Sequence, residues 1–447
     1  MEQHEKLFSN ENLKAMIIPL FLEQLLVALV GIADIFIAGF VGEAAVSGVS
    51  LVNAFNSIFI YWFMALASGG AVVISQYIGR RDTQRAGAAA TQLLLAGILF
   101  SLVSALVVLL TQTSLLTLMF GCVEDDVMEA CLVYLRISAY SYPALAVYNV
   151  GAALYRSFGK TVTTMRLAIL VNTINVAGNC IGVFVLNAGV AGVAWPSLIS
   201  RSFAAAVITL LCFSKKNPVS YVKEQLVRLD WNLQKQILRI AVPNGVESSV
   251  FQLVKVALSS VVALFGTYQI AANGVAQSIW SLAALVSVTM GPVFITVIGQ
   301  CMGAGALEQA EFYFKKLLRY TLIFGVAWNA LIFGVTLVLL QFYSLAEETK
   351  QLIIWLVLIH NIFNGVAFPY ADPLGKGLRA AGDISFTTLI SLFTTVGVRL
   401  VLSVFLGITL HMGVIGIAVA MCLDWVIRGL IFARRQKSGK WKTFKVI

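Results

Sequence analysis

The chain has 447 residues, of which 59% are hydrophobic and only 12% are charged, and its formal net charge is +10. Soluble domains usually carry about 25% charged residues, so the composition excludes an ordinary soluble domain and indicates an integral membrane protein. The excess of basic residues lies in short loops between apolar runs, where membrane topology explains it, and we therefore expect no nucleic-acid partner.

Apolar runs long enough to cross a hydrocarbon core of ~30 Å recur along nearly the whole chain. A transmembrane β-barrel would instead show alternating segments of about ten residues, so we predict an all-α polytopic membrane protein. Apolar runs and loop signals together predict twelve transmembrane helices. Their approximate bounds are 13–37, 46–78, 88–112, 128–157, 163–186, 189–214, 236–263, 270–302, 316–342, 349–377, 385–407 and 412–434.

The loops between the predicted spans alternate in charge. Basic residues occupy loops that follow even-numbered spans, including the segment between spans six and seven, and the tail after residue 434. Loops that follow odd-numbered spans have almost no basic residues and instead contain Glu43, Glu124, Asp125 and Asp126. By the positive-inside rule, we expect both termini and the central linker in the cytoplasm, in a multi-pass protein of the cell inner (plasma) membrane.

The sequence repeats itself at a spacing of 224 residues, with a brief shift to 223. The matched pairs include Pro19 with Pro243, Glu23 with Glu247, Gln76 with Gln300, and Arg156 with Arg379. The repeat predicts an N-terminal six-helix bundle in 1–214 and a C-terminal one in 236–434, with a linker at 215–235 and a basic tail at 435–447. Because six is even, both bundles enter the membrane in the same direction, and a pseudo-two-fold axis along the membrane normal relates them. Transporters built from repeats bind substrate near the midplane between the repeats. A duplicated channel or scaffold without moving parts is the alternative.

Asp34 is an acid in the middle of an otherwise apolar segment, VALVGIADIFIAGFVG at 27–42. A charge at mid-bilayer costs at least ~2.5–3.5 kcal/mol on insertion scales, so such a residue is a functional candidate by default. We interpret Asp34 as a proton or Na⁺ site that faces a cavity. A structural hydrogen bond to a neighbouring helix is the alternative.

Asn175 and Asn179 in predicted span five are four residues apart and therefore share one face of the helix, with Asn172 one turn earlier. If that face meets span one, the amides would hydrogen-bond Asp34 or coordinate a cation beside it. The alternative is that they only join helices through interhelical hydrogen bonds, which are common in membranes.

Two further acids are repeat mates. Glu23 and Glu247 each follow a proline by four residues, and either a functional site or an inherited packing role explains the match. Lys255 lies two helical turns beyond Glu247 on its face and is placed to neutralise it. Arg156 and Arg379 lie at predicted cytoplasmic helix ends, where we expect them to anchor the topology.

Two other charged pairs have spacings that favour ion pairing. Asp372 and Lys376 in span ten are four residues apart on one helix face. Arg399 in span eleven and Asp424 in span twelve can pair across helices. We favour a structural role for both pairs, and we keep Asp372 as a candidate for cation coupling.

Aromatic residues gather in spans two and four, and Pro143 is expected to kink span four. Such surfaces bind flat organic cations by stacking and cation–π contact, although ordinary core and interface packing explains them too. The predicted substrate cleft consists of Tyr140, Tyr142, Trp62, Met64, Glu23 and Gln252.

No P-loop is present, because RSFGKT at 156–161 lacks the leading glycine, with Leu154 at that position. We can build no catalytic constellation either, so we expect no enzyme, no cofactor and no bound metal beyond a possible Na⁺ near Asp34. The energy source must then be a gradient of H⁺ or Na⁺.

Several motifs together resemble the multidrug and toxic compound extrusion (MATE) family: GIADIFIAGFVGEAAVSGVSL (31–51), GGAVVISQYIGRRD (69–82), LRAAGDISFT (378–387) and GVIGIAVAMCLDWVIRG (413–429). The likeness covers essentially the full chain. It implies a V-shaped pair of bundles that exports small organic cations in exchange for H⁺ or Na⁺, and we expect a monomer with membrane lipids around it.

The resemblance also implies residue roles. Asp34 stands where the family's span-one motif has its coupling acid, and Asn175 fits the family's span-five asparagine. Asn179 stands where the DinF-like branch has an aspartate, which argues against that branch's proton network. Glu247 and Asp372 lie in the spans where the NorM-like branch has acids, but their spacing differs.

A flippase for lipid-linked or polysaccharide precursors, from the same wider superfamily, is the alternative function. Such proteins usually line the cleft with several arginines. Here the intramembrane arginines are few, namely Arg136, Arg201 and Arg399.

Overall fold

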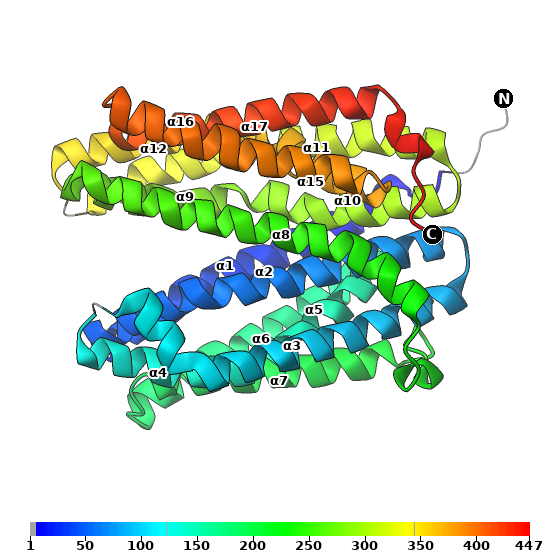
Figure 1. Cartoon of the computed structure of the whole chain (residues 1–447), viewed down its shortest axis with the longest axis horizontal. Coiled ribbons are helices and arrows are strands. Elements are labelled where there is room, and N and C mark those ends of the chain that lie inside the picture. The colour runs from blue at the N-terminus through cyan, green and yellow to red at the C-terminus, as the bar shows by residue number, and fades with distance from the viewer. Residues whose placement is uncertain (1–5, 122, 344) are drawn as a thin grey trace. The chain divides into compact units, whose positions relative to one another are not determined.

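The computed structural model of the chain describes residues 6–121, 123–343 and 345–447, and the regular secondary structure of these residues is helical (Figure 1). The first part contains α1 (Asn10–Gly39), α2 (Glu43–Gly79), α3 (Thr83–Phe120), α4 (Asp125–Tyr140), α5 (Tyr142–Ser157), α6 (Thr161–Cys180), the π-helix η1 (Ile181–Val185) and α7 (Ala191–Cys212). The connection to the next part holds a short 3-10 helix, η2 (Lys223–Leu226).

The second part begins with α8 (Trp231–Val262), η3 (Ala263–Phe265), α9 (Thr267–Ala283), α10 (Leu285–Gly303) and α11 (Leu307–Phe342). It continues with α12 (Glu347–Val366), α13 (Phe368–Ala371), α14 (Pro373–Ala380), α15 (Ile384–Phe393), the π-helix η4 (Thr394–Leu400), α16 (Val401–Val404), the π-helix η5 (Phe405–Thr409), α17 (Gly413–Lys437) and η6 (Lys440–Thr443).

The described residues form ten helical segments that are long and apolar enough to cross a membrane, and twelve if each of two bent helix pairs counts as one span. The bends measure 46° between α4 and α5 and 53° between α12 and the α13–α14 segment. Pro143 lies at the start of α5, and prolines also open α13 and α14. Proline lacks an amide hydrogen and clashes with the preceding turn, so it explains both breaks and confirms the predicted kink at Pro143.

Several helices are longer than the spans predicted from hydropathy. For example, the predicted span 88–112 lies inside α3, which begins at Thr83. Asp82 caps the start of this helix, because its carboxylate accepts a hydrogen bond from the backbone N–H of Arg85 at 2.9 Å. Hydropathy marks the part of a helix that suits hydrocarbon, whereas caps and the absence of a breaker set where the helix ends.

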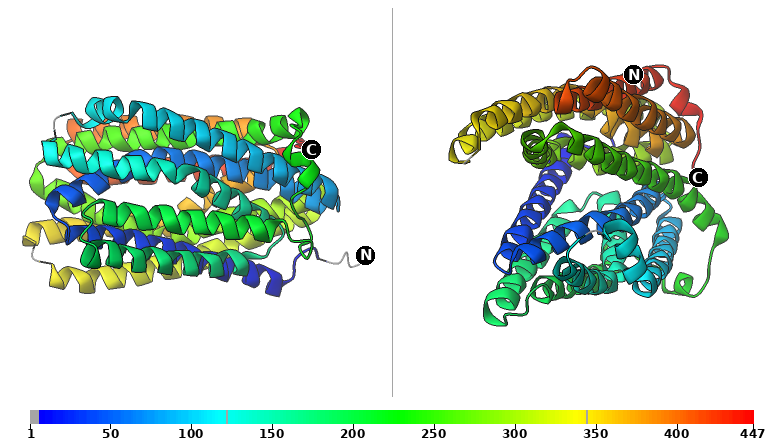
Figure 2. Two further views of the ribbon diagram at one scale, coloured as in Figure 1. Left: turned by 90° about the horizontal axis from the view of Figure 1, so that it is seen from below. Right: turned by 60° about the vertical axis from the view of Figure 1, so that its left-hand side comes forward.

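The chain divides into two compact units. One consists of Glu11–Gly245, and the other combines Met1–Asn10 with Val246–Ile447. Within each unit the long helices run alongside one another (Figure 2). The boundary therefore lies inside α8, and the first residues group with the second unit, in contrast to the predicted domain limits at 214 and 236.

The predicted linker 215–235 packs against the first unit. Gln92 at the start of α3 is buried, and its Nε2 donates to the carbonyl oxygen of Arg228 at 2.7 Å. Gln234 in turn donates from Nε2 to the carbonyl oxygen of Gln92 at 2.8 Å. Because buried side-chain amides satisfy the linker's backbone, this segment is held as part of the unit.

The N-terminal segment joins the second unit through backbone hydrogen bonds. The N–H of Leu7 donates to Oε1 of Gln309 at 2.9 Å, and the N–H of Phe8 donates to the Tyr313 hydroxyl at 2.9 Å. The Phe8 ring is buried and meets Tyr313 edge-on, with centroids 5.7 Å apart. This docking explains why the chain before α1 belongs to the other unit.

Candidate functional site

Asp34 of α1 meets the asparagine face of α6 inside the first unit. The Nδ2 of Asn179 donates to Oδ1 of Asp34 at 2.6 Å and lies 3.3 Å from Oδ1 of Asn175. Asn175 donates from its own Nδ2 to the Ser197 hydroxyl on α7 at 3.0 Å. The hydrogen bond expected between span five and span one is therefore present, and a chain of polar groups links α1, α6 and α7.

Within the described residues, a positive charge lies near Asp34 without forming an ion pair with it. Among the described residues, no Arg, Lys or His forms an ion pair with its carboxylate. Arg201 on α7 is near enough for its charge to act on Asp34, but its guanidinium donates to the Ser141 hydroxyl at 2.8 Å. Sequence reasoning noted Arg201 as an intramembrane arginine and did not connect it with Asp34, because the two are far apart in the chain.

The chemistry of this site suits a small cation. The carboxylate of Asp34 can take up a proton, or it can bind Na⁺ together with amide oxygens, since hard cations prefer oxygen ligands. The buried Oδ1 of Asn179 has no hydrogen-bond donor within the described part of the chain. Asn172, one turn earlier on α6, has no partner for its Nδ2 there either, so it does not join the Asp34 hydrogen bonds.

The helix that carries the asparagines is irregular directly after them. The π-helix η1 begins at Ile181, two residues beyond Asn179. Single π turns inside α-helices are rare and occur frequently at functional sites. Both α6 and η1 pack against α7, and Gly182 of η1 lies directly on the backbone of Gly192.

Gly182→Ala is expected to destabilise the protein, because the added Cβ would overlap the carbonyl oxygen of Gly192, which is backbone and cannot turn aside. Overpacking of this kind typically costs about 1–3 kcal/mol. Gly31→Ala in α1 is the matched control, since nothing lies within 4 Å of its Cβ position and alanine favours a helix. Thermal unfolding in detergent should show a lower midpoint for Gly182→Ala only; equal midpoints would contradict the packing argument.

Glu23 forms a buried ion pair with Arg156. One carboxylate oxygen lies 2.5 Å from the guanidinium, and the other accepts a hydrogen bond from the Thr164 hydroxyl at 2.8 Å. Only 3% of the Glu23 side chain is exposed. The Arg156 charge neutralises a buried acid, a contact that the sequence did not predict, and its role as a topology anchor stays a prediction. Both oxygens of Glu23 are engaged, which does not support its predicted contact with substrate.

The second unit repeats this arrangement. Arg379 pairs with Glu247, and its Nε donates to the Thr387 hydroxyl at 3.2 Å. These three residues are the repeat mates of the first set, at spacings of 223 or 224. Glu247 thus pairs with Arg379 and not with Lys255, so the expectation for Lys255 is wrong, whereas the topology role of Arg379 stays a prediction. Hydropathy marks these arginines as helix-end residues, whereas the bundle brings each one against an acid from another helix.

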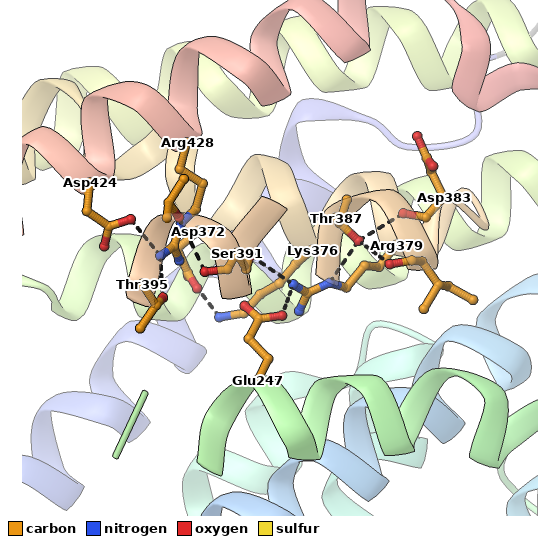
Figure 3. Close-up of polar contacts among 12 residues, drawn as sticks. Glu247, Asp372, Lys376, Arg379, Asp383, Thr387, Ser391, Thr395, Asp424 and Arg428 are labelled. Atoms are coloured by element: carbon orange, nitrogen blue, oxygen red, sulfur yellow. Dashed lines mark hydrogen bonds and ion pairs between the residues drawn. The ribbon is translucent and has the colours of Figure 1, made fainter. Parts of the chain in front are cut away.

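Figure 3 shows the polar side chains of the second unit that surround these groups. Lys376 pairs with Asp372 at 2.8 Å, which confirms the expected intrahelical pair. Asp424 is fully buried and lies 2.8 Å from Arg399, as expected from the sequence. Arg428, which sequence reasoning missed although it is four residues after Asp424, contacts the same carboxylate at 2.7 Å. Asp372 and Asp424, like Glu247, are thus neutralised by neighbouring cations.

A buried polar stripe follows α15 and η4 at helical spacing (Figure 3). Its hydroxyls accept hydrogen bonds from the arginines of α14 and α17. The stripe consists of Asp383, Thr387, Ser391, Thr394 and Thr395. Because these groups accept hydrogen bonds from arginine side chains inside the unit, the stripe explains how Arg379 and Arg428 are accommodated there.

The predicted aromatic wall divides into buried and exposed residues. Tyr142 is 1% exposed, and its hydroxyl donates to Oδ1 of Asn56 at 2.6 Å, so its predicted place on a substrate cleft is not supported. Tyr140 on the other side of the α4–α5 bend is 55% exposed. Trp62 packs against Gly245, and Met64 is 44% exposed.

One other candidate residue, Gln252, belongs to the second unit. Gln252 is half-buried on α8, three residues before Lys255 and therefore on the same side of that helix. Its proposed contact with substrate stays a prediction.

A family model described as MatE matches two segments of the chain, residues 19–181 and 243–405. The segments have equal lengths and start 224 residues apart, which confirms the internal repeat read from the sequence.

Curated relatives match nearly the full length. The chain is similar to the "Uncharacterized transporter YisQ" of Bacillus subtilis, with 25% identity over 433 residues that cover 95% of this chain and 93% of the relative. It is also similar to the "Probable multidrug resistance protein NorM" of Thermotoga maritima, with 22% identity over 435 residues that cover 96% and 92%.

Solved structures share the fold. One is described as the outward-facing conformation of a multidrug resistance MATE family transporter of the MOP superfamily, with a TM-score of 0.89 at 18% identity over 96% of each chain. A second, the crystal structure of MATE in the straight conformation, has a TM-score of 0.88 at 19% identity, again over 96% of each chain. The predicted all-α polytopic membrane fold is therefore confirmed.

Proposed function

The chain belongs to the MatE family, and from that premise we propose that it is a secondary active antiporter that exports small organic compounds, organic cations among them, in exchange for H⁺ or Na⁺. The names of its relatives, several of which are multidrug resistance or export proteins, support this substrate class. We further propose that both termini face the cytoplasm, because the basic loops favour that orientation.

The observation that carries the proposal is the contrast between Asp34 and the other acids deep in the predicted spans. Four carboxylates, those of Glu23, Glu247, Asp372 and Asp424, each contact an arginine or lysine. Asp34 has only the Asn179 amide, within the described residues. A carboxylate in an ion pair has a structural role, whereas a carboxylate that forms no ion pair is available to bind and release a small cation.

In the proposed cycle, Asp34 loads H⁺ or Na⁺ in one orientation of the bundles and releases it in the other. Protonation removes the negative charge that accepts the Asn179 hydrogen bond. Na⁺ would keep the charge and recruit the Asn179 and Asn175 oxygens. A ligand shifts a conformational equilibrium only through its different affinities for the two states, so coupling requires that substrate and ion favour opposite openings.

The energetics of such an exchange are sufficient. One proton that moves down about 150 mV of total driving force supplies ~3.5 kcal/mol, which supports a substrate ratio of a few hundred-fold. If one proton exchanges for one monovalent cation, no net charge moves. The pH difference alone would then drive export, and the membrane potential would not contribute.

Fluorescent dye uptake into everted vesicles, which corresponds to export from the cell, tests the proposal. We expect active dye transport when either a pH gradient alone or a Na⁺ gradient alone is imposed, and none without a gradient. The ion that drives transport identifies the cargo of Asp34. Dye movement that needs neither gradient would contradict antiport, and rapid passive ion flux from purified protein in liposomes would indicate a channel instead.

A further inference from the structure

We propose that the exposed face at the start of α8 binds the headgroup of an anionic phospholipid at the membrane surface. This face forms a groove of about 470 Å³ on the first unit. Its lining residues are Trp231, Asn232, Lys235, Leu238 and Arg239. They all come from the first three turns of one helix, so the groove keeps its shape as long as this helix end is fixed.

Two cations in the groove are available for a ligand. Lys235 and Arg239 are four residues apart, so their side chains lie on one face of α8, and both are exposed. Within the described part of the chain, neither side chain forms a hydrogen bond or an ion pair. Two neighbouring cations with an amide beside them match the charge and the acceptor oxygens of a phosphate group.

The nearest acid in the sequence does not compete for these cations. Oδ1 of Asp230 accepts hydrogen bonds from the backbone N–H groups of Asn232 at 2.9 Å and Leu233 at 3.2 Å. It therefore caps α8, as carboxylates at helix starts commonly do. The Asp230 N–H in turn donates to Oε1 of the buried Gln92 at 3.2 Å, which ties the helix start to α3. The two cations are thus carried on a helix end that is held in place before any ligand arrives.

The apolar residues around the cations favour a lipid over a soluble anion. Trp231 is 71% exposed, Leu238 38% and Val242 45%, and they continue the same side of α8 away from its start. Tryptophan is enriched at the membrane–water interface, and long basic side chains extend from apolar surface to the headgroups. A phosphate between Lys235 and Arg239 would leave the attached acyl chains over Leu238 and Val242.

Native mass spectrometry of the full-length protein, released from nanodiscs of phosphatidylglycerol and phosphatidylcholine, tests this site. We expect preferential retention of phosphatidylglycerol, and a reduction of at least about threefold in the Lys235→Gln/Arg239→Gln variant. The matched control, Lys215→Gln/Lys216→Gln, removes the same charge from the exposed linker outside the groove and should retain lipid as the original protein does.

Three outcomes would overturn the proposal. They are equal retention of the two lipids, an equal loss in both variants, and displacement of phosphatidylglycerol by inorganic phosphate at millimolar concentration, which would indicate a site for a soluble anion. Thermal unfolding without added lipid should give the same midpoint for both variants, so that lost binding cannot be attributed to misfolding. The test does not involve Asp34 or transport, and its failure would leave the proposed antiport unaffected.

Discussion

Asp34→Asn is expected to abolish gradient-driven export, with dye transport in everted vesicles reduced to the level of vesicles without the protein. The substitution keeps the size of the side chain and an oxygen that accepts the hydrogen bond from Asn179. It removes the charge that attracts H⁺ or Na⁺, so the ion can no longer favour one orientation over the other. The fold should survive, because the site loses no ion pair.

The control for this experiment is Glu129→Gln, which removes an exposed carboxylate near the start of α4. This variant should export dye normally. Binding of substrate to purified Asp34→Asn should persist but no longer respond to pH or Na⁺. Normal export by Asp34→Asn would refute the assignment of Asp34 as the coupling residue, whichever ion drives the original protein.

Asn179→Ala would separate two explanations of the Asp34 hydrogen bond. If Asn179 only joins helices, its removal should lower stability and leave the ion response unchanged. If its oxygen is a Na⁺ ligand, the apparent Na⁺ affinity should fall while the response to pH persists.

The sequence was sufficient to predict the features that depend on hydropathy and repetition. Twelve apolar runs correspond to the ten long helical segments and two bent pairs of the structure, because hydrocarbon requires helices of a fixed minimum length. The Asp34–Asn179 contact was predictable because an acid and a row of amides in membrane helices each need a partner. The Arg399–Asp424 pair followed from the same requirement.

Other features could not be predicted, because they depend on which helices are neighbours. Arg156 lies near the end of a predicted span, and hydropathy alone assigns such arginines to the membrane surface. Only the packing of α5 against α1 and α6 brings it to Glu23 and Thr164. The burial of Tyr142 likewise depends on α2, which supplies Asn56. The attachment of the linker to the first unit depends on its hydrogen bonds to Gln92, which no composition signal marks.

The internal repeat also contains a signal for the buried ion pairs. Arg156 and Arg379 are repeat mates, and so are Glu23 and Glu247, so each copy of the repeat contains one acid and one arginine at matched positions. Two positions that keep opposite charges in both copies inside a membrane suggest a shared partner, since an isolated charge there is costly. The structure shows that each copy pairs its own acid with its own arginine.

This duplication leads to the second large effect. Arg156→Met should destabilise the first unit by roughly 3–5 kcal/mol, because it leaves the buried Glu23 carboxylate without a counter-charge. The double variant Glu23→Gln/Arg156→Met should lose much less, because no buried charge remains. The apparent free energy of unfolding, measured by titration with sodium dodecyl sulfate, would give the interaction energy of the pair in a double-mutant cycle.

The same cycle at Glu247 and Arg379 is the internal control, because the repeat places an equivalent pair in the second unit. Both cycles should show a favourable coupling energy of the same sign. Here the Glu247 side chain is 18% exposed, against 3% for Glu23, so the single-variant loss should be smaller in the second unit. Additive losses in either cycle would mean that the pair does not stabilise its unit. A selective loss of ion coupling in Glu247→Gln, with stability unchanged, would instead indicate that Glu247 takes part in ion coupling.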